Sequence, residues 1–201
     1  EIKNKFMKRS IQTIVYLPNF LSWVILATVV VNIFSYEGPI NAVLEMLGIE
    51  PILFMASNKW FRSVLIVTDV WKGFGYGAII YLAALSGIDP GLYEAAAIDG
   101  ANRFKRVWHI TLPGILPTIM LVTIMNLPNV LNAGFDQIFN LYNPLVMETA
   151  DIIDTWVYRV GLVERQYSLG TAVGLLRSIV GIILMLSANK IAQKVTDYRI
   201  F

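Results

Sequence analysis

The sequence predicts an all-α protein, a polytopic bundle of transmembrane helices with four spans. Hydrophobic residues make up 56% of its 201 residues and charged residues 15%, with a mean hydropathy of +0.62. Soluble domains carry about 25% charged residues, so this composition favours a membrane protein. Apolar stretches near the roughly 20 residues that a membrane helix needs, and Lys and Arg residues grouped between alternate stretches, support the same prediction.

The first predicted span covers residues 11–35, which contain no charged side chain. An outer loop over residues 36–60 leads to the second span, residues 63–86. That span contains Asp69 and Lys72, which are spaced to share one helix face. A charge inside a membrane costs about 2.5–3.5 kcal/mol on insertion scales. We therefore expect these charges to face protein or a hydrated path.

The third predicted span covers residues 110–135, which are uncharged but contain several prolines. A second outer loop, residues 136–166, includes the segment DIIDTWVYRVGL. That segment is too short and too charged to cross a membrane, so we expect a helix on the outer face. The fourth span covers residues 166–189, an apolar run that contains Arg177.

Basic residues predict the orientation of the spans, because cytoplasmic loops carry an excess of Lys and Arg. Four spans return the chain to the side on which it begins. The basic residues on that side are Lys3, Lys5, Lys8, Arg9, Arg103, Lys105, Arg106, Lys190, Lys194 and Arg199. The opposite side has Lys59, Arg62, Arg159 and Arg165. Both ends of the chain and residues 87–109 are therefore predicted to be cytoplasmic.

The residue types exclude several kinds of site. The chain has no cysteine and one histidine, His109, which leaves no thiolate ligand and no histidine cluster. No GxxxxGK phosphate loop is present. The GFGYG segment at residues 73–77 lacks the strand context of a dinucleotide fingerprint, and its glycines favour close helix packing or a bend. We expect no catalytic residue, metal site or cofactor site in this chain.

Polar and aromatic residues within the spans are candidates for a solute path. Asn126, Asn129 and Asn132 recur every three residues and drift by about 60° per step on a helix, which gives one broad polar stripe. Such stripes hold helices together or line a hydrated path. Trp71 and Tyr76 are aromatic candidates for the same path, as are Tyr81 and Phe135.

Asp69 and Arg177 are predicted to lie at similar depth. Asp69 is roughly 12 Å from the outer end of its span and Arg177 roughly 10 Å from the outer end of its own, at 1.5 Å per residue. One interpretation is an ion pair between two helices. The alternative is that one of these charges, Arg177 in particular, faces the solute path.

The polar segment at residues 87–113 predicts a helical hairpin. Asp89 is a favourable N-cap and Pro90 fits the first helical position. The alanines that follow favour helix, and Asp99-Gly100 predicts a turn. A second helix is expected over residues 101–110.

This segment resembles a known motif. Glu94-Ala95-Ala96, three residues, Gly100, nine residues, Ile110, one residue and Leu112-Pro113 match the EAA loop of permease subunits in type I binding-protein-dependent ABC importers. The segments YLPNFLSW at 16–23 and SLGTAVGLLRSIVG at 168–181 are similar to polysaccharide and oligosaccharide uptake permeases, relatives of the larger maltose-transporter permease.

The resemblance implies a role for the hairpin. In that family the EAA loop is the coupling helix, which sits in a groove of a cytoplasmic ATPase. The residues that would bind the ATPase are Glu94, Ala95, Ala96, Asp99 and Gly100. ATP and Mg would be bound by that partner. Residues 1–201 would form one permease domain, with further spans upstream.

The resemblance also implies the setting in which the chain works. It implies a second homologous permease subunit, an ATPase dimer, an extracytoplasmic solute-binding protein, a sugar substrate and membrane lipid, with no nucleic acid. The location would be the bacterial cytoplasmic membrane. A secondary transporter or channel without an ATPase is the alternative, but such a protein is expected to have coupling-ion carboxylates and Asp69 is the only deep one. A membrane enzyme fits less well, because few catalytic residue types are present.

Overall fold

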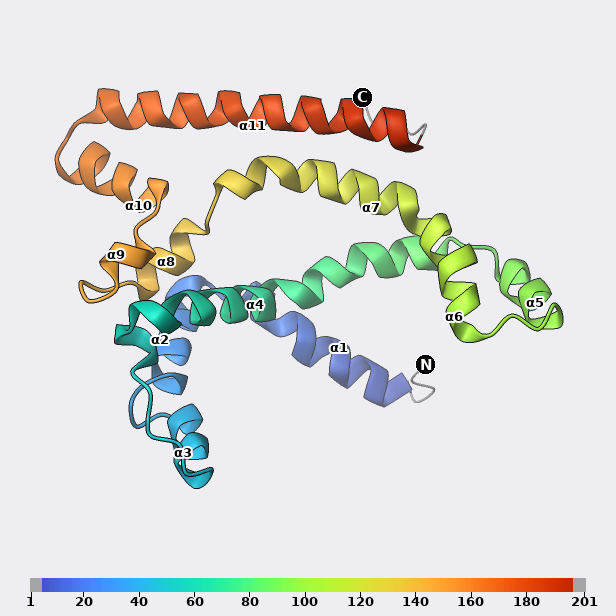
Figure 1. Ribbon diagram of the computed structural model, residues 1–201, viewed down its shortest axis with the longest axis horizontal. Coiled ribbons are helices and arrows are strands. Elements are labelled where there is room, and N and C mark those ends of the chain that lie inside the picture. Colours follow the sequence, from blue (N-terminus) through green and yellow to red (C-terminus); the bar gives the residue numbers. More distant parts are fainter. Residues whose placement is uncertain (1–4, 197–201) are drawn as a thin grey trace. The chain divides into compact units, whose positions relative to one another are not determined.

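The computed structural model describes residues 5–196 (Figure 1), and this part of the chain contains helices and no strand. The all-α prediction is therefore confirmed. Lys3 and Arg199, which entered the orientation argument, lie outside the described residues, and so do the side chains of Lys5, Lys8 and Lys194.

Two compact units make up the chain. Unit 1 comprises Glu1–Tyr76 with Asn132–Leu175, and unit 2 comprises Gly77–Leu131 with Leu176–Phe201. Two long helices, α4 (Asn58–Ser86) and α11 (Tyr167–Thr196), each have one end in unit 1 and the other in unit 2.

The remaining helices each belong to one unit. Those of unit 1 are α1 (Lys5–Phe20), α2 (Trp23–Ile33), α3 (Pro39–Met46), the 3₁₀ helix η1 (Phe54–Ala56), α8 (Phe135–Leu141), α9 (Met147–Ala150), α10 (Ile153–Val157) and the π-helix η4 (Tyr158–Val163). Those of unit 2 are α5 (Pro90–Ile98), α6 (Arg103–Arg106), the π-helix η2 (Val107–Thr111), α7 (Leu112–Asn126) and the 3₁₀ helix η3 (Leu127–Leu131).

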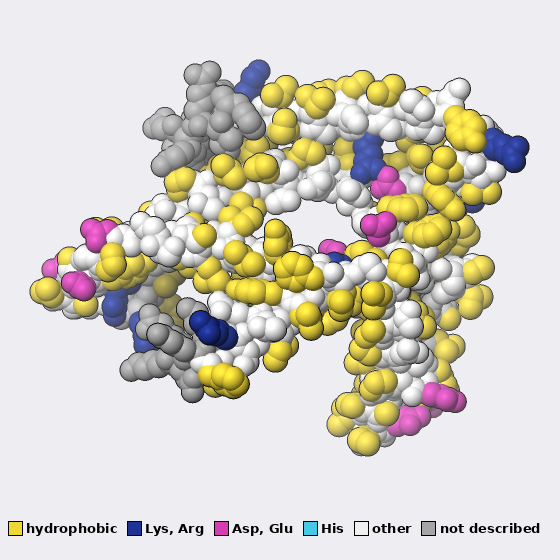
Figure 2. Space-filling view, turned by 180° about the vertical axis from the view of Figure 1, so that it is seen from behind, with side chains coloured by type: hydrophobic (Ala, Val, Ile, Leu, Met, Phe, Trp, Pro, Cys, Tyr) yellow, Lys and Arg dark blue, Asp and Glu magenta, His cyan; other side chains and the backbone are white. Residues whose placement is uncertain are grey.

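Three helical stretches within the described residues are long and apolar enough to cross a membrane. They are Asn58–Ser86, Arg103–Leu131 and Tyr167–Lys190. A fourth span exists if Arg9–Phe20 and Trp23–Ile33, which meet at 108°, are counted together. Figure 2 shows hydrophobic side chains spread over the outward surfaces, as expected where lipid replaces water.

The first predicted span is wrong as a single helix. Residues 11–35 break between α1 and α2, where Ser22 adopts an extended conformation and its hydroxyl accepts a hydrogen bond from the Ile25 N–H at 3.4 Å. Ser22 is thus an N-cap that starts a new helix. Hydropathy alone does not register this cap, because the residues on both sides of it are apolar.

The third predicted span is displaced toward the N-terminus. Its helix begins at Arg103 and ends at Leu131, instead of covering residues 110–135. Pro113 is accommodated by the π-helix before it, where the Leu112 N–H bonds to the Val107 carbonyl. Gly134, at φ 80°, then separates this helix from α8. The helix expected in the DIIDTWVYRVGL segment is present as α10 and η4, and its position on the outer face stays a prediction.

The core of unit 1 forms where α2 and the start of α4 meet the segments after Gly134. α2 packs against α8. The buried cluster is Ala27, Val30, Phe54, Phe61, Val64, Leu141, Val146 and Ala150. Asn41, also buried, donates to the Ser35 and Ile52 carbonyls and accepts from the Ile52 N–H, which fixes the loop that contains α3. This core sets the outer part of α4 beside residues 132–152.

Candidate functional site

The hairpin between α4 and α7 is built from local hydrogen bonds. The Asp89 carboxylate accepts from the Gly91 N–H at 2.8 Å, which caps α5 as the sequence predicts. Gly100 has φ +74°, a conformation that glycine adopts without strain. The Asn102 side chain then accepts from the Lys105 N–H at 2.9 Å and caps α6. The predicted helix, turn and second helix are confirmed, although the second helix continues into α7.

Contacts near the base of the hairpin connect its two arms. The hydroxyls of Tyr93 and Thr111 lie 3.0 Å apart. Gly114 provides room for Ile88, whose side chain would lie 2.9 Å from a Cβ at that position. Toward the tip, α5 has no buried residue. Glu94, Ala95, Asp99 and Gly100 are exposed and Ala96 is half-buried, so the side chains of the EAA pattern are accessible to a partner.

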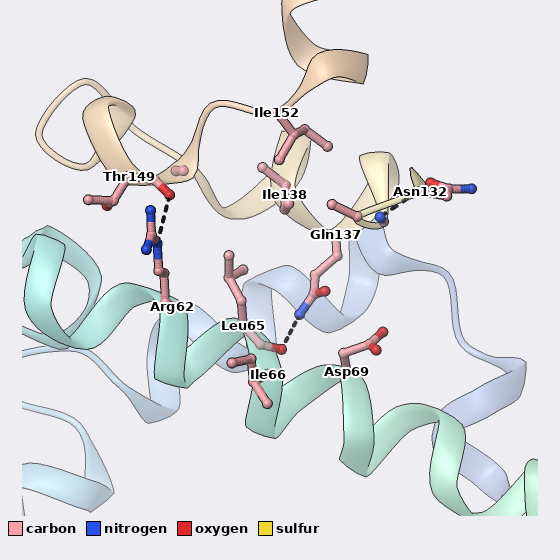
Figure 3. A pocket seen from close by; sticks show the side chains of 12 residues that line it. Arg62, Leu65, Ile66, Asp69, Asn132, Gln137, Ile138, Thr149 and Ile152 are labelled. Atoms are coloured by element: carbon pink, nitrogen blue, oxygen red, sulfur yellow. Dashed lines mark hydrogen bonds between the residues drawn. The ribbon is translucent and has the colours of Figure 1, made fainter. Parts of the chain in front are cut away.

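A polar pocket lies in unit 1 between α4 and the segments after residue 131 (Figure 3). Its volume is about 410 Å³. From α4 it receives Arg62, Leu65, Ile66 and Asp69, which follow the spacing of one helix face. The facing side is formed by Asn132, Ala133, Gly134, Gln137, Ile138, Thr149, Ala150 and Ile152.

Three hydrogen bonds, donated by two side chains, connect α4 with the facing side of this pocket. The Arg62 Nε donates to the Thr149 carbonyl at 3.3 Å. The buried Gln137 amide donates to the Leu65 carbonyl at 2.8 Å and to the Thr68 hydroxyl at 2.9 Å. Figure 3 shows the bond from Arg62 to Thr149 and the bond from Gln137 to Leu65. They hold the pocket in shape without occupying all of its polar groups.

The remaining polar groups suit a hydroxylated ligand. Among the described residues of unit 1 the Asp69 carboxylate has no hydrogen-bond partner, and Figure 3 shows it directed away from the Gln137 bond. Asn132 accepts from the Gly134 N–H at 3.3 Å, which leaves its amide N–H groups to donate. A carboxylate acceptor beside amide and guanidinium donors can bind adjacent hydroxyls.

Other predicted path residues lie elsewhere. Trp71 lines a small apolar groove with Val67 and residues of α2. The Tyr76 ring lies edge-on to Phe20, with centroids 6.4 Å apart. Lys72 was expected to share a face with Asp69, but its Nζ donates to the Asn19 carbonyl at 3.0 Å and lies over the Trp23 ring. That expectation was wrong, because a long side chain reaches the break between α1 and α2.

The predicted asparagine stripe is only partly helical. Asn126 ends α7, and the Asn129 amide donates to its side chain at 3.4 Å. Asn132 lies beyond the end of η3 and belongs to unit 1, so the three residues do not share one helix. The predicted third span included both Pro128 and Gly134, whereas the helix ends between these two residues, at Leu131. Arg177 is half-buried on α11, and its pairing with Asp69 stays a prediction.

Sequence reasoning did not select Arg62 or Gln137 for the site. Arg62 was counted only for orientation, although it precedes Asp69 by two helical turns and faces the same side. That spacing was a usable signal. Gln137 had none, since its partners Leu65 and Thr68 are about 70 residues away and meet it only through the fold.

Comparison with known proteins gives consistent matches. A family model described as "Binding-protein-dependent transport system inner membrane component" matches residues 2–197. Protein LplB of Bacillus subtilis (strain 168) is 43% identical over 100% of this chain and 64% of its own length. The polygalacturonan/rhamnogalacturonan transport system permease protein YteP of the same organism is 39% identical over 100% of this chain and 63% of its own length.

A solved structure also matches the whole chain. The crystal structure of a bacterial alginate ABC transporter, in complex with alginate pentasaccharide-bound periplasmic protein, contains a chain that is 39% identical, with a TM-score of 0.94. The match covers 100% of this chain and 70% of that one. The chain spans a little under two thirds of the length of the two Bacillus relatives.

Proposed function

This chain belongs to the family of binding-protein-dependent transport system inner membrane components, and we propose that it is the permease subunit of an ATP-driven importer for an oligosaccharide. As a member of that family it is a transport component of the inner membrane and not an enzyme. In the proposed function the chain contributes one part of the solute path and transmits ATPase movement to it through the EAA hairpin.

The observation that carries the proposal is the exposed, rigidly capped hairpin. Glu94 and Ala95 project from a helix with no buried residue, and Asp89 and Asn102 cap the two arms. A helix in which no residue is fully buried within its own chain can gain stability from packing against a partner. The small alanines allow close approach, and the Glu94 carboxylate can pair with a cationic group or backbone N–H groups.

The polar pocket supports a sugar as the solute. Asp69, Asn132 and Arg62 offer acceptors and donors for hydroxyl groups within one cavity of unit 1. The relative YteP and the alginate transporter have names that refer to polysaccharide transport. We place one sugar unit at this pocket, and Asn126, Asn129, Tyr76, Trp71 and Arg177 remain candidates for other parts of the path.

The proposal includes the partners of an importer of this kind. The sugar would arrive on an extracytoplasmic solute-binding protein, as the family description suggests. A second homologous permease would complete the path. An ATPase dimer would receive the EAA hairpin and would bind ATP and Mg, as the EAA pattern at residues 94–113 implies.

Two glycines give a matched test of coupling. Gly100 and Gly48 have φ values of +74° and +76°, and at both positions a Cβ would meet nothing within 4 Å. Valine at either position introduces the same backbone strain, of about 1–2 kcal/mol for the left-handed conformation. Only Gly100 lies in the hairpin. We expect Gly100→Val to insert normally but to lose sugar uptake and ATPase co-purification, while Gly48→Val retains both.

The measurement is uptake of labelled oligosaccharide into cells that express the complete importer, together with affinity purification. Full uptake by Gly100→Val would contradict the coupling role. Equal loss in Gly48→Val would attribute the defect to strain alone. Uptake that persists without any ATPase would instead support a secondary transporter or channel.

A further inference from the structure

The second arm of the hairpin borders an open pocket that shares only Ala96 with the residues assigned to coupling. Its volume is about 380 Å³, and its lining residues are Ala96, Ala101, Lys105, Arg106, His109 and Ile110. Three of these carry cationic or titratable nitrogen groups, and none is acidic. The small alanines leave room beside those groups for a ligand.

One buried donor of this pocket, on Arg106, is unsatisfied within the described residues. The Arg106 Nε is buried and has no hydrogen-bond partner within the described part of the chain. The His109 Nδ1 lies 2.9 Å from the Lys105 carbonyl, which fixes the imidazole ring and leaves Nε2 available. Buried polar groups are nearly always paired, so an orphaned guanidinium N–H beside Lys105 indicates that an anionic acceptor is missing.

The position of the pocket along the helix identifies where that anion would come from. Arg103–Leu131 is a helical stretch of 29 residues, about 43 Å long at 1.5 Å per residue. A bilayer is about 30 Å thick in its hydrocarbon and 40–45 Å with its headgroups. Residues 110–131 are uncharged and long enough to cross the hydrocarbon. Residues 103–109 therefore lie at the level of the headgroups.

The other face of the same segment is apolar and exposed. Phe104 is 78% exposed and Trp108 67%, with Val107 exposed between them. Their spacing places them on one side of the helix, apart from Lys105 and His109. Aromatic residues beside Lys and Arg are the pattern of a segment at the membrane surface, where rings enter the interface and cations meet lipid phosphates.

We propose that the Lys105–Arg106–His109 pocket binds the phosphate of an anionic phospholipid, with Phe104 and Trp108 inserted beside its acyl chains. Lys and Arg supply charge-assisted hydrogen bonds to phosphate oxygens. A bound lipid would brace the arm of the hairpin that continues into α7. This inference depends on the membrane location of the family and is independent of the sugar and of the ATPase.

Native mass spectrometry of the complete importer in neutral detergent tests the proposal, with phosphatidylglycerol, phosphatidylcholine and inorganic phosphate as separate probes. Lys105→Gln and Arg106→Gln each remove one charge from the pocket. Arg103→Gln removes a charge one turn away that does not line it. We expect phosphatidylglycerol occupancy to fall about fivefold for each pocket charge removed and to stay unchanged in Arg103→Gln.

Several results would overturn the proposal. An equal loss of phosphatidylglycerol occupancy in Arg103→Gln would show that the lipid is attracted by the general positive charge of the segment. Unchanged occupancy in both pocket variants would show that the pocket does not bind the lipid. Phosphatidylglycerol displaced by millimolar inorganic phosphate would identify a soluble anion as the ligand. Release of the ATPase by Lys105→Gln with lipid occupancy intact would assign the pocket to an acidic protein surface. Lys105 is exposed and its side chain makes no hydrogen bond within the described part of the chain, so this variant remains decisive if Arg106→Gln does not fold.

Discussion

Gly75 of α4 lies directly against the backbone carbonyl of Val15 in α1. A Cβ at residue 75 would overlap that carbonyl and the Val15 side chain, whereas a Cβ at Gly73 or Gly77 would meet nothing within 4 Å. The GFGYG segment was interpreted as permitting close helix packing, and one of its three glycines has that role. The absence of a side chain at residue 75 lets the two backbones of unit 1 touch.

Alanine at residues 73 and 75 should therefore have opposite effects. In a helix, Gly→Ala is favourable by about 1 kcal/mol on propensity alone, so Gly73→Ala is expected to be neutral or stabilising. Gly75→Ala inserts a methyl group where there is no room, and overpacking costs about 1–3 kcal/mol. Thermal inactivation of the purified importer in detergent should rank Gly73→Ala at or above the native protein and Gly75→Ala below it. Equal midpoints would show that α1 and α4 do not cross at this contact.

Two exposed side chains test the predicted orientation of the chain. Ile98, 88% exposed, ends α5 on the predicted cytoplasmic side, and Met46, 86% exposed, ends α3 in the first outer loop. The sequence contains no cysteine, so each position can be labelled singly. Ile98→Cys should resist a membrane-impermeant thiol reagent added to spheroplasts, and Met46→Cys should react. Asn102 is a poorer position for this test because its side chain caps α6.

Permeabilised cells provide the control, since both cysteines should then react. Labelling of Ile98→Cys in intact spheroplasts would show that the predicted topology is inverted. The hairpin would then lie outside the cell, where a cytoplasmic ATPase cannot bind it.

The second outer loop contains an ion pair that predicts pH dependence. Arg159 Nη2 donates to Asp151 Oδ2 at 2.6 Å, with side chains 33% and 28% exposed. The hydrogen bond from Arg159 holds the pKa of Asp151 below its usual value of 3.8. A carboxylate whose pKa is lowered on folding stabilises the folded state fully at pH values above its pKa in the unfolded chain. This contribution is lost as the pH falls through its pKa in the folded protein. The effect is local and modest, because the pair is near the surface.

Hydrogen exchange of the peptide covering residues 151–163 measures this contribution. At pH 7, Asp151→Asn should exchange faster than the native protein over that peptide. Below the folded pKa of Asp151 both proteins are neutral at residue 151, so the difference should vanish. Residues 34–56, which are fixed by Asn41, provide an internal control that should not change. A difference that stays constant as the pH is lowered through the titration of Asp151 would assign the effect to the Asn side chain and not to the ion pair.

Local features of the fold could be predicted from the sequence, and features that depend on distant contacts could not. The hairpin was predicted well because Asp89, Gly100 and the alanines between them act within a few residues. The break at Ser22 was also local, but its cap is hidden by apolar neighbours that give the same hydropathy on both sides. Interpreting Ser22-Trp23 as a helix start would have divided the first span correctly.

The polar pocket illustrates the second case. Asp69 was identified because a carboxylate in an apolar span is costly. Its neighbours Asn132 and Gln137 come from a segment more than 60 residues away that folds back onto α4. No periodicity in the sequence indicates that return, since it depends on the helix ending at Leu131, on Gly134 preceding α8 and on α8 packing against α2.

Asp69 and Arg177 provide the last prediction, which decides between a structural pair and a solute-binding role. If they pair, removal of either one leaves an uncompensated charge, at a cost of about 3–5 kcal/mol for buried pairs generally. Water defects in the membrane reduce that figure. The double variant Asp69→Asn with Arg177→Gln should then accumulate to a higher level in membranes than either single variant. Lys72→Gln with Arg177→Gln is the matched control, because Lys72 is bonded to Asn19 and its loss should be additive.

If Arg177 instead binds an acidic sugar, Arg177→Gln should spare the protein level and weaken uptake of that sugar selectively. Strictly additive losses in both double variants would show that Asp69 and Arg177 do not interact, and Asp69 would then remain a free acceptor in the polar pocket.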